Sequence, residues 1–359
     1  MDEQTKQILE LFSQPAFFVK DGMILWCNHA AGTHLLPDTP LSALLGREEM
    51  LYTLWQRTGT LQLPLTLDGR EYDVCVRAIG EGDLFVATPR ETALNATASA
   101  VVNASATLRK PLHMMLGAAS ELFDHIDESA DAAALPAASR LNRSIYQFVR
   151  LCGQMSDGGS LLLRRKELRR TPTDLVAFFD EFLAQARPLV ESAGLTLHYR
   201  PLSRPLRADI DTALVERALY NLFSNAVNYT PRGGNITLSL RRQERQLLIS
   251  VTDDGEGISP DVAATLFERF ADRPLGDSRW GIGLGLPMVR EIAWLHDGTI
   301  SVSANENGRG TTVRFSLSLE PAPLNLRSRM LNYDYCGTLH HGLVELSDVL
   351  DAEMFNPIL

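Results

Sequence analysis

The first ninety residues alternate short apolar runs with turn signals. LQLPLTLDG and EYDVCVRAIG predict two strands, and Asp-Gly or Glu-Gly pairs at residues 21, 68 and 81 predict tight turns. Apolar and aromatic residues at this spacing favour an antiparallel sheet with helical excursions. We therefore expect a small α/β domain over residues 1–90.

A seven-residue apolar repeat follows over residues 91–165. It forms two interleaved rows on one helix: Leu94, Val101, Leu108, Met115 and Leu122, with Ala98, Ser105, Leu112, Ala119 and Ile126. A second helix carries a similar stripe: Ala134, Ala138, Leu141, Ile145, Phe148, Cys152 and Met155. Two such helices form a hairpin with one apolar face uncovered, which a second hairpin would cover. We therefore expect a homodimer through a four-helix bundle.

Residues 166–320 alternate helices with mostly amphipathic strands, which predicts a two-layer α/β sandwich. The fold class expected for the whole chain is therefore multidomain α+β. The tail over residues 321–359 has one apolar pattern, LVELSDVLDAEMF, which predicts a single amphipathic helix. We assign this tail no function from the sequence.

Composition and charge exclude some classes of function. The chain of 359 residues carries 34 basic and 44 acidic side chains, a net charge of −10, which disfavours binding to nucleic acid. Cys27, Cys75, Cys152 and Cys336 form no CxxC pair, so we expect reduced thiols. The start of the chain is unlike a signal peptide, and no run reaches the roughly 20 apolar residues of a membrane span. We expect a cytoplasmic protein with no membrane span.

Polar residues gather in the region of the sandwich. Asn221 and Asn225 lie four residues apart in ERALYNLFSNAVNY, and so on one helix face. Asparagine is a poor helix-interior residue, so this pair indicates a polar partner, such as a hydrated Mg²⁺ that also touches phosphates. Taken by itself, the pair is better explained by a solvated helix face.

Glycine-rich turns follow the asparagines. In TDDGEGI, Asp253 ends a strand and Gly255 and Gly257 open a turn, where glycine permits positive φ and close approach to a flat ring. A carboxylate at a strand end can accept a hydrogen bond from the amino group of adenine. In GIGLGL, Gly281, Gly283, Leu284 and Gly285 precede a helix whose free amides would face an anion such as a triphosphate. GRGTT, which contains Thr311, leads into the last strand.

Together and in this order, these phrases resemble the nucleotide-binding boxes of sensor histidine kinases, a branch of the GHKL ATPases. NLFSNAVNYTP resembles the asparagine box, DDGEGI, GIGLGL and GRGTT the glycine boxes, and LFERF the phenylalanine box. The resemblance implies bound ATP and Mg²⁺. It implies that Asn225 holds Mg²⁺, Asn221 assists near the phosphates, Tyr229 packs on adenine and Asp253 accepts its amino group. Residues 271–281 would form the ATP lid.

Two further features bear on that resemblance. The phrase DGMILWCNHAA, from Asp21 to Ala31, resembles a PAS domain, although any other small α+β domain remains an alternative. At Asn228 the kinase family often has a basic residue, and the difference suggests weaker phosphate binding.

The phosphoacceptor phrase of the family is degenerate here. Where the family has a sequence like S-H-E-L-R-T-P-L, this chain has SATLRKPL from Ser105 to Leu112. Ala106 carries no nucleophile, Thr107 replaces the carboxylate base, and Lys110 replaces a small polar residue. His113 lies seven residues after Ala106, about 10 Å along a helix, and is the substitute acceptor to test.

Three hypotheses of function follow. The first is a sensor histidine kinase-like enzyme of two-component signalling that phosphorylates a histidine on a partner chain. The second is a catalytically silent, ATP-binding pseudokinase that regulates a partner kinase or a response regulator. The third is a serine kinase of the anti-sigma-factor type, since Ser105 and Thr107 flank the empty position. In all three, self-phosphorylation at the usual position is not expected.

Overall fold

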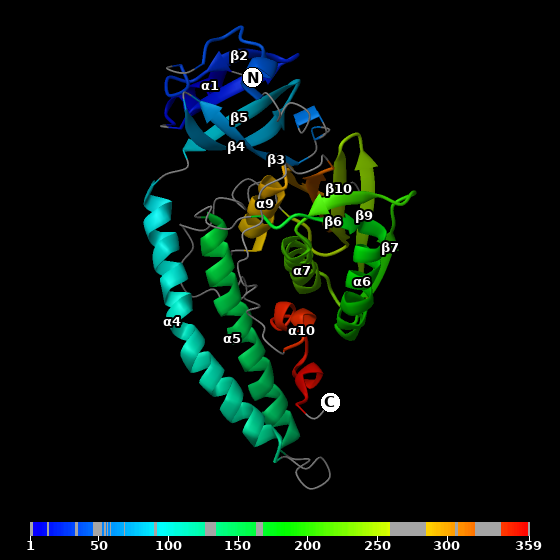
Figure 1. Ribbon diagram of the computed structural model, residues 1–359. Coiled ribbons are helices and arrows are strands. Elements are labelled where there is room, and N and C mark those ends of the chain that lie inside the picture. Colours follow the sequence, from blue (N-terminus) through cyan, green and yellow to red (C-terminus); the bar gives the residue numbers. More distant parts are fainter. Residues whose placement is uncertain are drawn as a thin grey trace.

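The computed structural model describes residues 3–12, 14–32, 35–45, 52–53, 55, 57, 59–67, 69–89, 92–125, 134–162, 168–258, 285–305, 308–319 and 339–357. The chain forms an N-terminal domain at one end, a long helical hairpin, and an α/β sandwich beside the hairpin (Figure 1). The C-terminal segment, residues 339–357, returns to lie between the hairpin and the sandwich.

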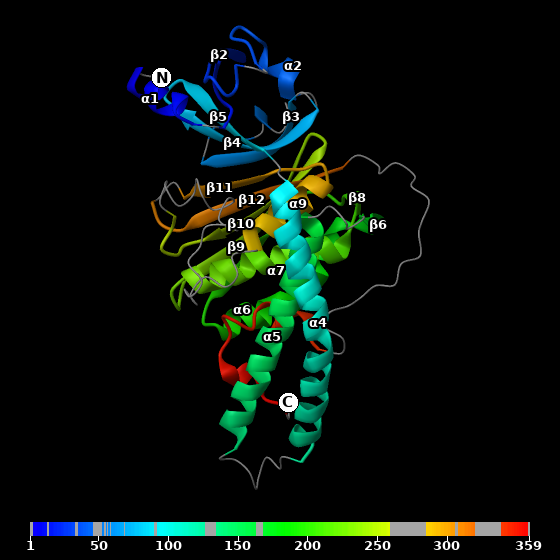
Figure 2. The same ribbon diagram turned by 90° about the vertical axis from the view of Figure 1, so that its left-hand side faces the viewer.

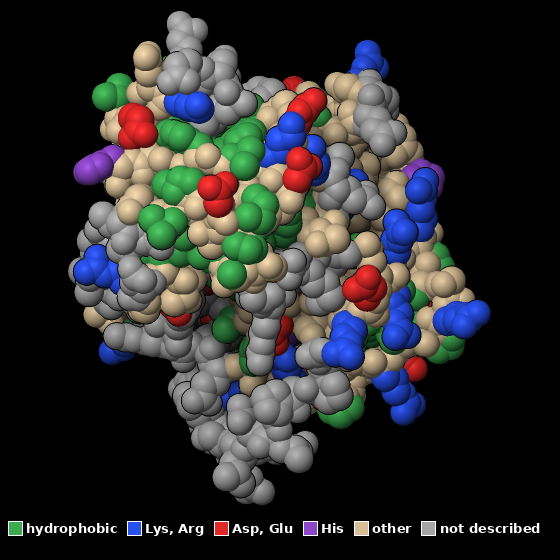
Figure 3. All heavy atoms as spheres, turned by 90° about the horizontal axis from the view of Figure 1, so that it is seen from above, with side chains coloured by type: hydrophobic (Ala, Val, Ile, Leu, Met, Phe, Trp, Pro, Cys, Tyr) green, Lys and Arg blue, Asp and Glu red, His purple; other side chains and the backbone are tan. Residues whose placement is uncertain are grey.

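The N-terminal domain is built on five antiparallel strands in the order β2-β1-β5-β4-β3. Its elements are α1 (Glu3–Glu10), β1 (Ala16–Lys20), β2 (Met23–Cys27), α2 (Leu41–Leu45), β3 (Thr60–Leu67), β4 (Arg70–Ile79) and β5 (Gly82–Pro89). The two strands expected from LQLPLTLDG and EYDVCVRAIG are β3 and β4, paired in register from Thr60–Arg77 to Leu67–Arg70. Viewed from above in Figure 3, apolar side chains gather on the outer end of this domain. Among the described residues of this domain, the large apolar side chains that are exposed are those of Ile8, Leu11, Phe12, Leu25 and Leu36.

The asparagine in the phrase from Asp21 to Ala31 has a structural role. Asn28 is buried, and its Oδ1 accepts hydrogen bonds from the amides of Ala16 and Ala31, both at 2.9 Å. Its Nδ2 donates to the carbonyl oxygens of Leu9 and Gln14. One side chain therefore ties α1, the start of β1 and the turn after β2 together.

The hairpin consists of α4 (Thr92–Phe123) and α5 (Leu135–Leu162). The two expected rows on α4 differ in burial where their side chains are described: Ser105, Leu112 and Ala119 are buried, and Leu112 and Ala119 pack with Ile145 and Cys152 of α5. The other row is half-buried at Leu108 and exposed at Met115 and Leu122. The hairpin therefore keeps an apolar row on its outside within the part of α4 that is described.

Within the described residues, the main sheet of the sandwich has five strands in the order β11-β12-β10-β9-β7, and β6 and β8 form a separate two-stranded sheet. Helices α6, α7 and α9 cover one face of the main sheet (Figure 2). Its elements are β6 (Thr171–Asp174), α6 (Leu175–Ser192), β7 (Thr196–Arg200), β8 (Arg207–Ile210), α7 (Thr212–Tyr229), β9 (Asn235–Gln243), β10 (Gln246–Asp253), α9 (Gly285–Leu295), β11 (Ile300–Ala304) and β12 (Thr311–Ser318). Phe179, Phe223 and Phe315 are fully buried between the layers. Each contributes about 1.5–3 kcal/mol by leaving water. The expected two-layer sandwich is thus present.

Caps explain where the two long helices of the sandwich begin. Asp174 precedes α6 and accepts hydrogen bonds from the amides of Val176 and Ala177. Asp211 precedes α7 and accepts from the amide of Leu214. An aspartate in this position satisfies amides that the first helical turn leaves without partners, and so fixes the register of the helix.

Within the part of the chain that the structure describes, the sheets of the N-terminal domain and the sandwich join into one sheet of ten strands, which the sequence did not predict. Strand β3 pairs antiparallel with β11, from Thr60–Val302 to Gln62–Ile300. Gly59 enters this junction with φ 73°, and an added Cβ would lie 2.1 Å from the carbonyl oxygen of Val302. Only glycine fits there.

The C-terminal segment differs from the single amphipathic helix expected from LVELSDVLDAEMF. It forms a short helix α10 (His341–Glu345), a turn, and the 3₁₀ helix η3 (Ala352–Phe355). The helix breaks because the apolar residues serve two different partners: Val344 packs in the hairpin core, whereas Leu346, Leu350 and Phe355 pack in the core of the sandwich.

Candidate nucleotide site

Asp253 lies where β10 ends, and its side chain is only 8% exposed. Its Oδ1 accepts hydrogen bonds from the amides of Gly255 at 3.0 Å and Thr311 at 3.1 Å. Burial raises the pKa of Asp253, and these backbone hydrogen bonds oppose the rise. The turn after β10 and the start of β12 therefore meet at one buried carboxylate.

Two glycines allow this turn to lie against the end of α7. An added Cβ on Gly255 would lie 2.3 Å from the carbonyl oxygen of Tyr229, so glycine is required for close packing. Its backbone does not have the positive φ that the sequence suggested; Gly257 does, with φ 78°. The two glycines therefore serve different needs, space at Gly255 and backbone conformation at Gly257.

The asparagines of α7 occupy different environments. Asn221 is buried, and its Nδ2 donates to the carbonyl oxygen of Arg217 at 2.8 Å. An added Cβ on Gly285, the first residue of α9, would lie 3.2 Å from the Asn221 Oδ1. Asn225 is half-buried and Asn228 exposed. Asn221 is therefore not on a solvated helix face, because it is buried against the start of α9.

Sequence reasoning missed Asn305, which holds the GRGTT turn in place. Its Nδ2 donates to the carbonyl oxygens of Asp253 at 2.7 Å and Arg309 at 2.9 Å, and its Oδ1 accepts from the Thr312 hydroxyl at 2.7 Å. The available signal was an asparagine at the end of a strand, directly before a glycine-rich turn.

The described residues of the site fit an adenine nucleotide with a magnesium ion. The buried Asp253 carboxylate lies in a turn that Gly255 lets pack against the end of α7, and the start of α9 lies against Asn221 of the same helix. The amides at a helix start suit phosphate, and carboxamide oxygens suit Mg²⁺. Gly281, Gly283 and Leu284, and the proposed lid over 271–281, lie outside the described residues.

Residues 210–321 match the family described as histidine kinase-, DNA gyrase B-, and HSP90-like ATPase. The sensor-like histidine kinase SenX3 of Mycobacterium tuberculosis is 32% identical over 227 residues, which cover 61% of this chain and 52% of SenX3. The chain is a relative of the sensor histidine kinases. The sensor histidine kinase WalK of Bacillus subtilis is 27% identical over 298 residues, 78% of this chain and 48% of WalK.

The fold is also similar to that of a solved histidine kinase structure. Full-length ShkA in complex with AMPPNP aligns with a TM-score of 0.51 at 24% identity, over 63% of this chain and 47% of ShkA. The chain spans about half the length of SenX3 and WalK, so the activity of those whole kinases does not transfer with the match. No helix within the described ranges is both long and apolar enough to cross a bilayer.

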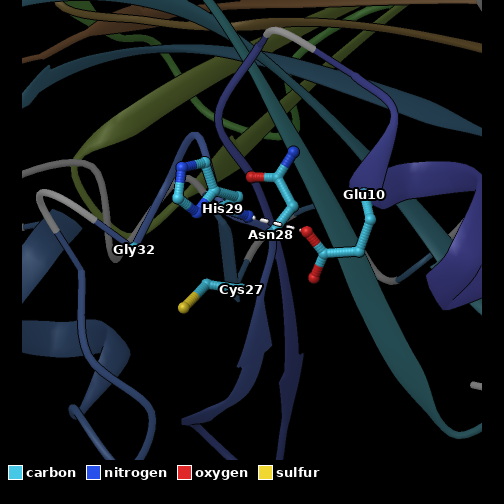
Figure 4. Close-up of a pocket in the computed structure, with 5 residues that line it drawn as sticks. All are labelled: Glu10, Cys27, Asn28, His29 and Gly32. Carbon is cyan, nitrogen blue, oxygen red and sulfur yellow. Dashed lines mark hydrogen bonds between the residues drawn. The ribbon is translucent and has the colours of Figure 1, made fainter.

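A hollow lies in the N-terminal domain, far along the chain from the candidate nucleotide residues. It has a volume of about 320 Å³ and is lined by Glu10, Cys27, Asn28, His29 and Gly32 (Figure 4). Glu10 accepts a hydrogen bond from the His29 amide at 2.9 Å, and burial raises the pKa of the Cys27 thiol. The Asn28 side chain is occupied by backbone partners and so is not available to a ligand in the hollow. Cys27, Cys75 and Cys152 form no disulfide within the described residues, and Cys336 lies outside them.

Proposed function

We propose that this chain is a sensor histidine kinase-like protein of two-component signalling that binds ATP and Mg²⁺ in the sandwich and does not phosphorylate its own hairpin. The observation that carries the proposal is the buried Asp253 carboxylate, held by Gly255 and Thr311 within the ATPase family match. Asn225 would hold Mg²⁺, Asn221 would lie near the phosphates, and Tyr229 would pack on adenine. When bound, Mg²⁺ would neutralise charge on the phosphates.

The hairpin supports the absence of self-phosphorylation. Ala106 and Thr107 are exposed on α4, where a partner could reach them, but neither is a histidine or a carboxylate. The Thr107 hydroxyl donates to the carbonyl oxygen of Asn103 at 2.8 Å. His113 is exposed, with Nδ1 2.7 Å from the Arg109 carbonyl oxygen, and it remains the substitute acceptor to test.

The serine-kinase alternative finds less support. Ser105 is 1% exposed and belongs to the same row of α4 as Leu112 and Ala119, which pack in the hairpin core, so a kinase cannot reach its hydroxyl without a local opening of the structure. The pseudokinase alternative is supported equally well, because a nucleotide site combined with an acceptor position that carries no histidine suits a regulator of a partner kinase or response regulator. The N-terminal domain would act as a PAS-like sensor, and we place the protein in the cytoplasm, where ATP is available.

The test of this function is incubation of the purified protein with γ-labelled ATP and Mg²⁺. We expect bound nucleotide and no covalent label on the chain. Acid-labile label would indicate phosphohistidine, and acid-stable label would indicate phosphoserine or phosphothreonine. Failure to bind ATP in a calorimetric titration would overturn the proposal as a whole.

The exposed row on α4 predicts a homodimer. Met115 and Leu122 would be covered by a second hairpin, so light scattering should give about twice the chain mass of 39.7 kDa. Met115→Glu with Leu122→Glu should shift the protein to monomer, because charges cannot be buried there without partners. Ser120→Glu, at an exposed position outside the row, is the control and should stay dimeric. A wild-type monomer at micromolar concentration would contradict the prediction.

A further inference from the structure

The C-terminal segment, residues 339–357, places side chains in two hydrophobic cores at once. Val344 is fully buried in the hairpin cluster with Ile145 and Val149. Leu350 and Phe355 are buried in the core of the sandwich. Phe355 also meets the ring of Tyr146 on α5, edge to face, with centroids 5.2 Å apart. A segment that is buried on both sides resists separation of the hairpin from the sandwich.

Side chains of α5 also hold the backbone of the segment. Asn142 donates from Nδ2 to the Phe355 carbonyl oxygen at 2.8 Å, and Arg143 donates from Nε to that of Ser347 at 3.1 Å. Gln147 donates to the Ser347 carbonyl oxygen as well, at 3.3 Å. These contacts fix the turn between α10 and η3 along one face of α5.

A buried carboxylate lies at the centre of the contact. Glu345 is 0% exposed, and its Oε2 is 3.7 Å from the Arg150 Nε of α5, while its Oε1 is 3.9 Å from the Arg217 Nε of α7. His341 Nε2 lies 3.6 Å from the same carboxylate. One glutamate of the C-terminal segment thus faces one arginine from the hairpin and one from the sandwich.

Other ionic partners surround this core. Arg150 also pairs with Asp348, Arg217 with Asp157 of α5, and His341 with Glu216 of α7 at 3.1 Å. Burial alone would raise the pKa of Glu345, but the bond from His341 and the two guanidinium groups outweigh it and lower the pKa to about 2. Glu345 is therefore charged at neutral pH, and its removal leaves buried cations with fewer partners.

The cluster touches the helix that carries the candidate nucleotide asparagines. Arg150 donates from Nη2 to the Ser224 hydroxyl at 2.9 Å, next to Asn225 in the chain. The Arg217 carbonyl oxygen accepts the bond from Asn221. A displacement of α7 on nucleotide binding would therefore move groups that α5 and the C-terminal segment hold directly.

We propose that residues 339–357 are an intramolecular clamp that locks the sandwich onto α5, with Glu345 as the positioning residue that joins Arg150 to Arg217. Because the clamp binds both the hairpin and α7, a movement of α7 when nucleotide binds would also move α5. The hairpin would therefore change with the occupancy of the nucleotide site. The second part rests on the proposed ATP binding; the first does not.

Hydrogen–deuterium exchange of the full chain tests the clamp. In Glu345→Gln, amides of α5 around residues 143–150 should exchange at least about tenfold faster than in wild type. A chain that ends at Leu319 should show the same change or a larger one. Asp351→Asn is the matched control: it removes the carboxylate that pairs with Arg232 at 2.6 Å, but both side chains are mostly exposed, so exchange should stay within about twofold.

Unchanged exchange in α5 for both Glu345→Gln and the shortened chain would overturn the clamp. Exchange in β3 and β4 checks that each variant is folded. If Glu345→Gln unfolds, Asp348→Asn, at a more exposed position, replaces it.

A second experiment repeats the exchange measurement with ATP and Mg²⁺. Protection of amides from exchange should change in α7 and α5 of wild type, but only in α7 of Glu345→Gln. Loss of all response in wild type would count against ATP binding, whereas an α5 response that survives in Glu345→Gln would count against transmission through the clamp.

Discussion

Replacement of Asp253 by asparagine is expected to weaken ATP binding by about tenfold to a hundredfold and to leave the fold intact, which is the range for a lost hydrogen bond to a charged group. Asparagine has the same shape, and its carbonyl oxygen can keep the bonds from Gly255 and Thr311. The second position then becomes an NH₂ donor, which opposes the amino group of adenine. Calorimetric titration with ATP and Mg²⁺ measures the effect.

Stability provides the independent readout. Burial raises the pKa of Asp253 above its ordinary 3.8. A carboxyl group with a raised pKa in the folded state favours folding only at low pH, and that contribution is lost as pH rises through the folded pKa. The charged carboxylate thus costs stability at neutral pH, so Asp253→Asn should melt at the same temperature as wild type or higher.

Two other variants sharpen the result. Asp254→Asn removes a neighbouring charge that binds Asn235 at the surface, and its ATP affinity should change by less than about threefold. Asn225→Asp, at the proposed magnesium position, should weaken binding sharply, as Asp253→Asn does. Identical titrations for wild type, Asp253→Asn and Asn225→Asp would show that the nucleotide assignment is wrong.

The sequence predicts the sandwich and the local part of its site because both depend on short-range patterns. The apolar periodicity of α7 places Asn221 and Asn225 on one helix, and a strand followed by glycines places Asp253 at a turn. The role of Asn305 could not be predicted, because its partners Asp253 and Thr312 come close to it only when the turn folds, and no repeating sequence pattern marks such a contact.

Long-range contacts account for what could not be predicted. The pairing of β3 with β11 joins residues more than two hundred positions apart, and its only local trace is Gly59 at the junction. The structure of the C-terminal segment could not be predicted for a related reason. Its apolar residues alternate between two cores, so LVELSDVLDAEMF resembles one amphipathic helix, and the role of Glu345 depends on Arg150 and Arg217 from elsewhere in the chain.

Restoring the acceptor pair with Ala106→His and Thr107→Glu is expected to give the protein acid-labile label from γ-labelled ATP. Both positions are exposed on α4, so the new side chains enter solvent and should not disturb the hairpin core. The glutamate would act as base toward the imidazole. Ala106→His alone should therefore label about a hundredfold more slowly than the pair, within the usual range for a positioned general base.

The outcome separates the first two hypotheses of function. Label in the double variant, and its loss when Asp253→Asn is added, would mean that only the acceptor pair has been lost and that the sandwich still transfers phosphoryl groups. A double variant that binds ATP but stays unlabelled would favour the pseudokinase, and the clamp offers a physical reason, because a sandwich locked onto α5 cannot approach residue 106. Adding Glu345→Gln to that unlabelled variant tests the reason directly: label that appears only then identifies the clamp as the barrier. Strong acid-labile label on the unmodified protein would contradict the prediction, and His113→Ala would then locate the acceptor.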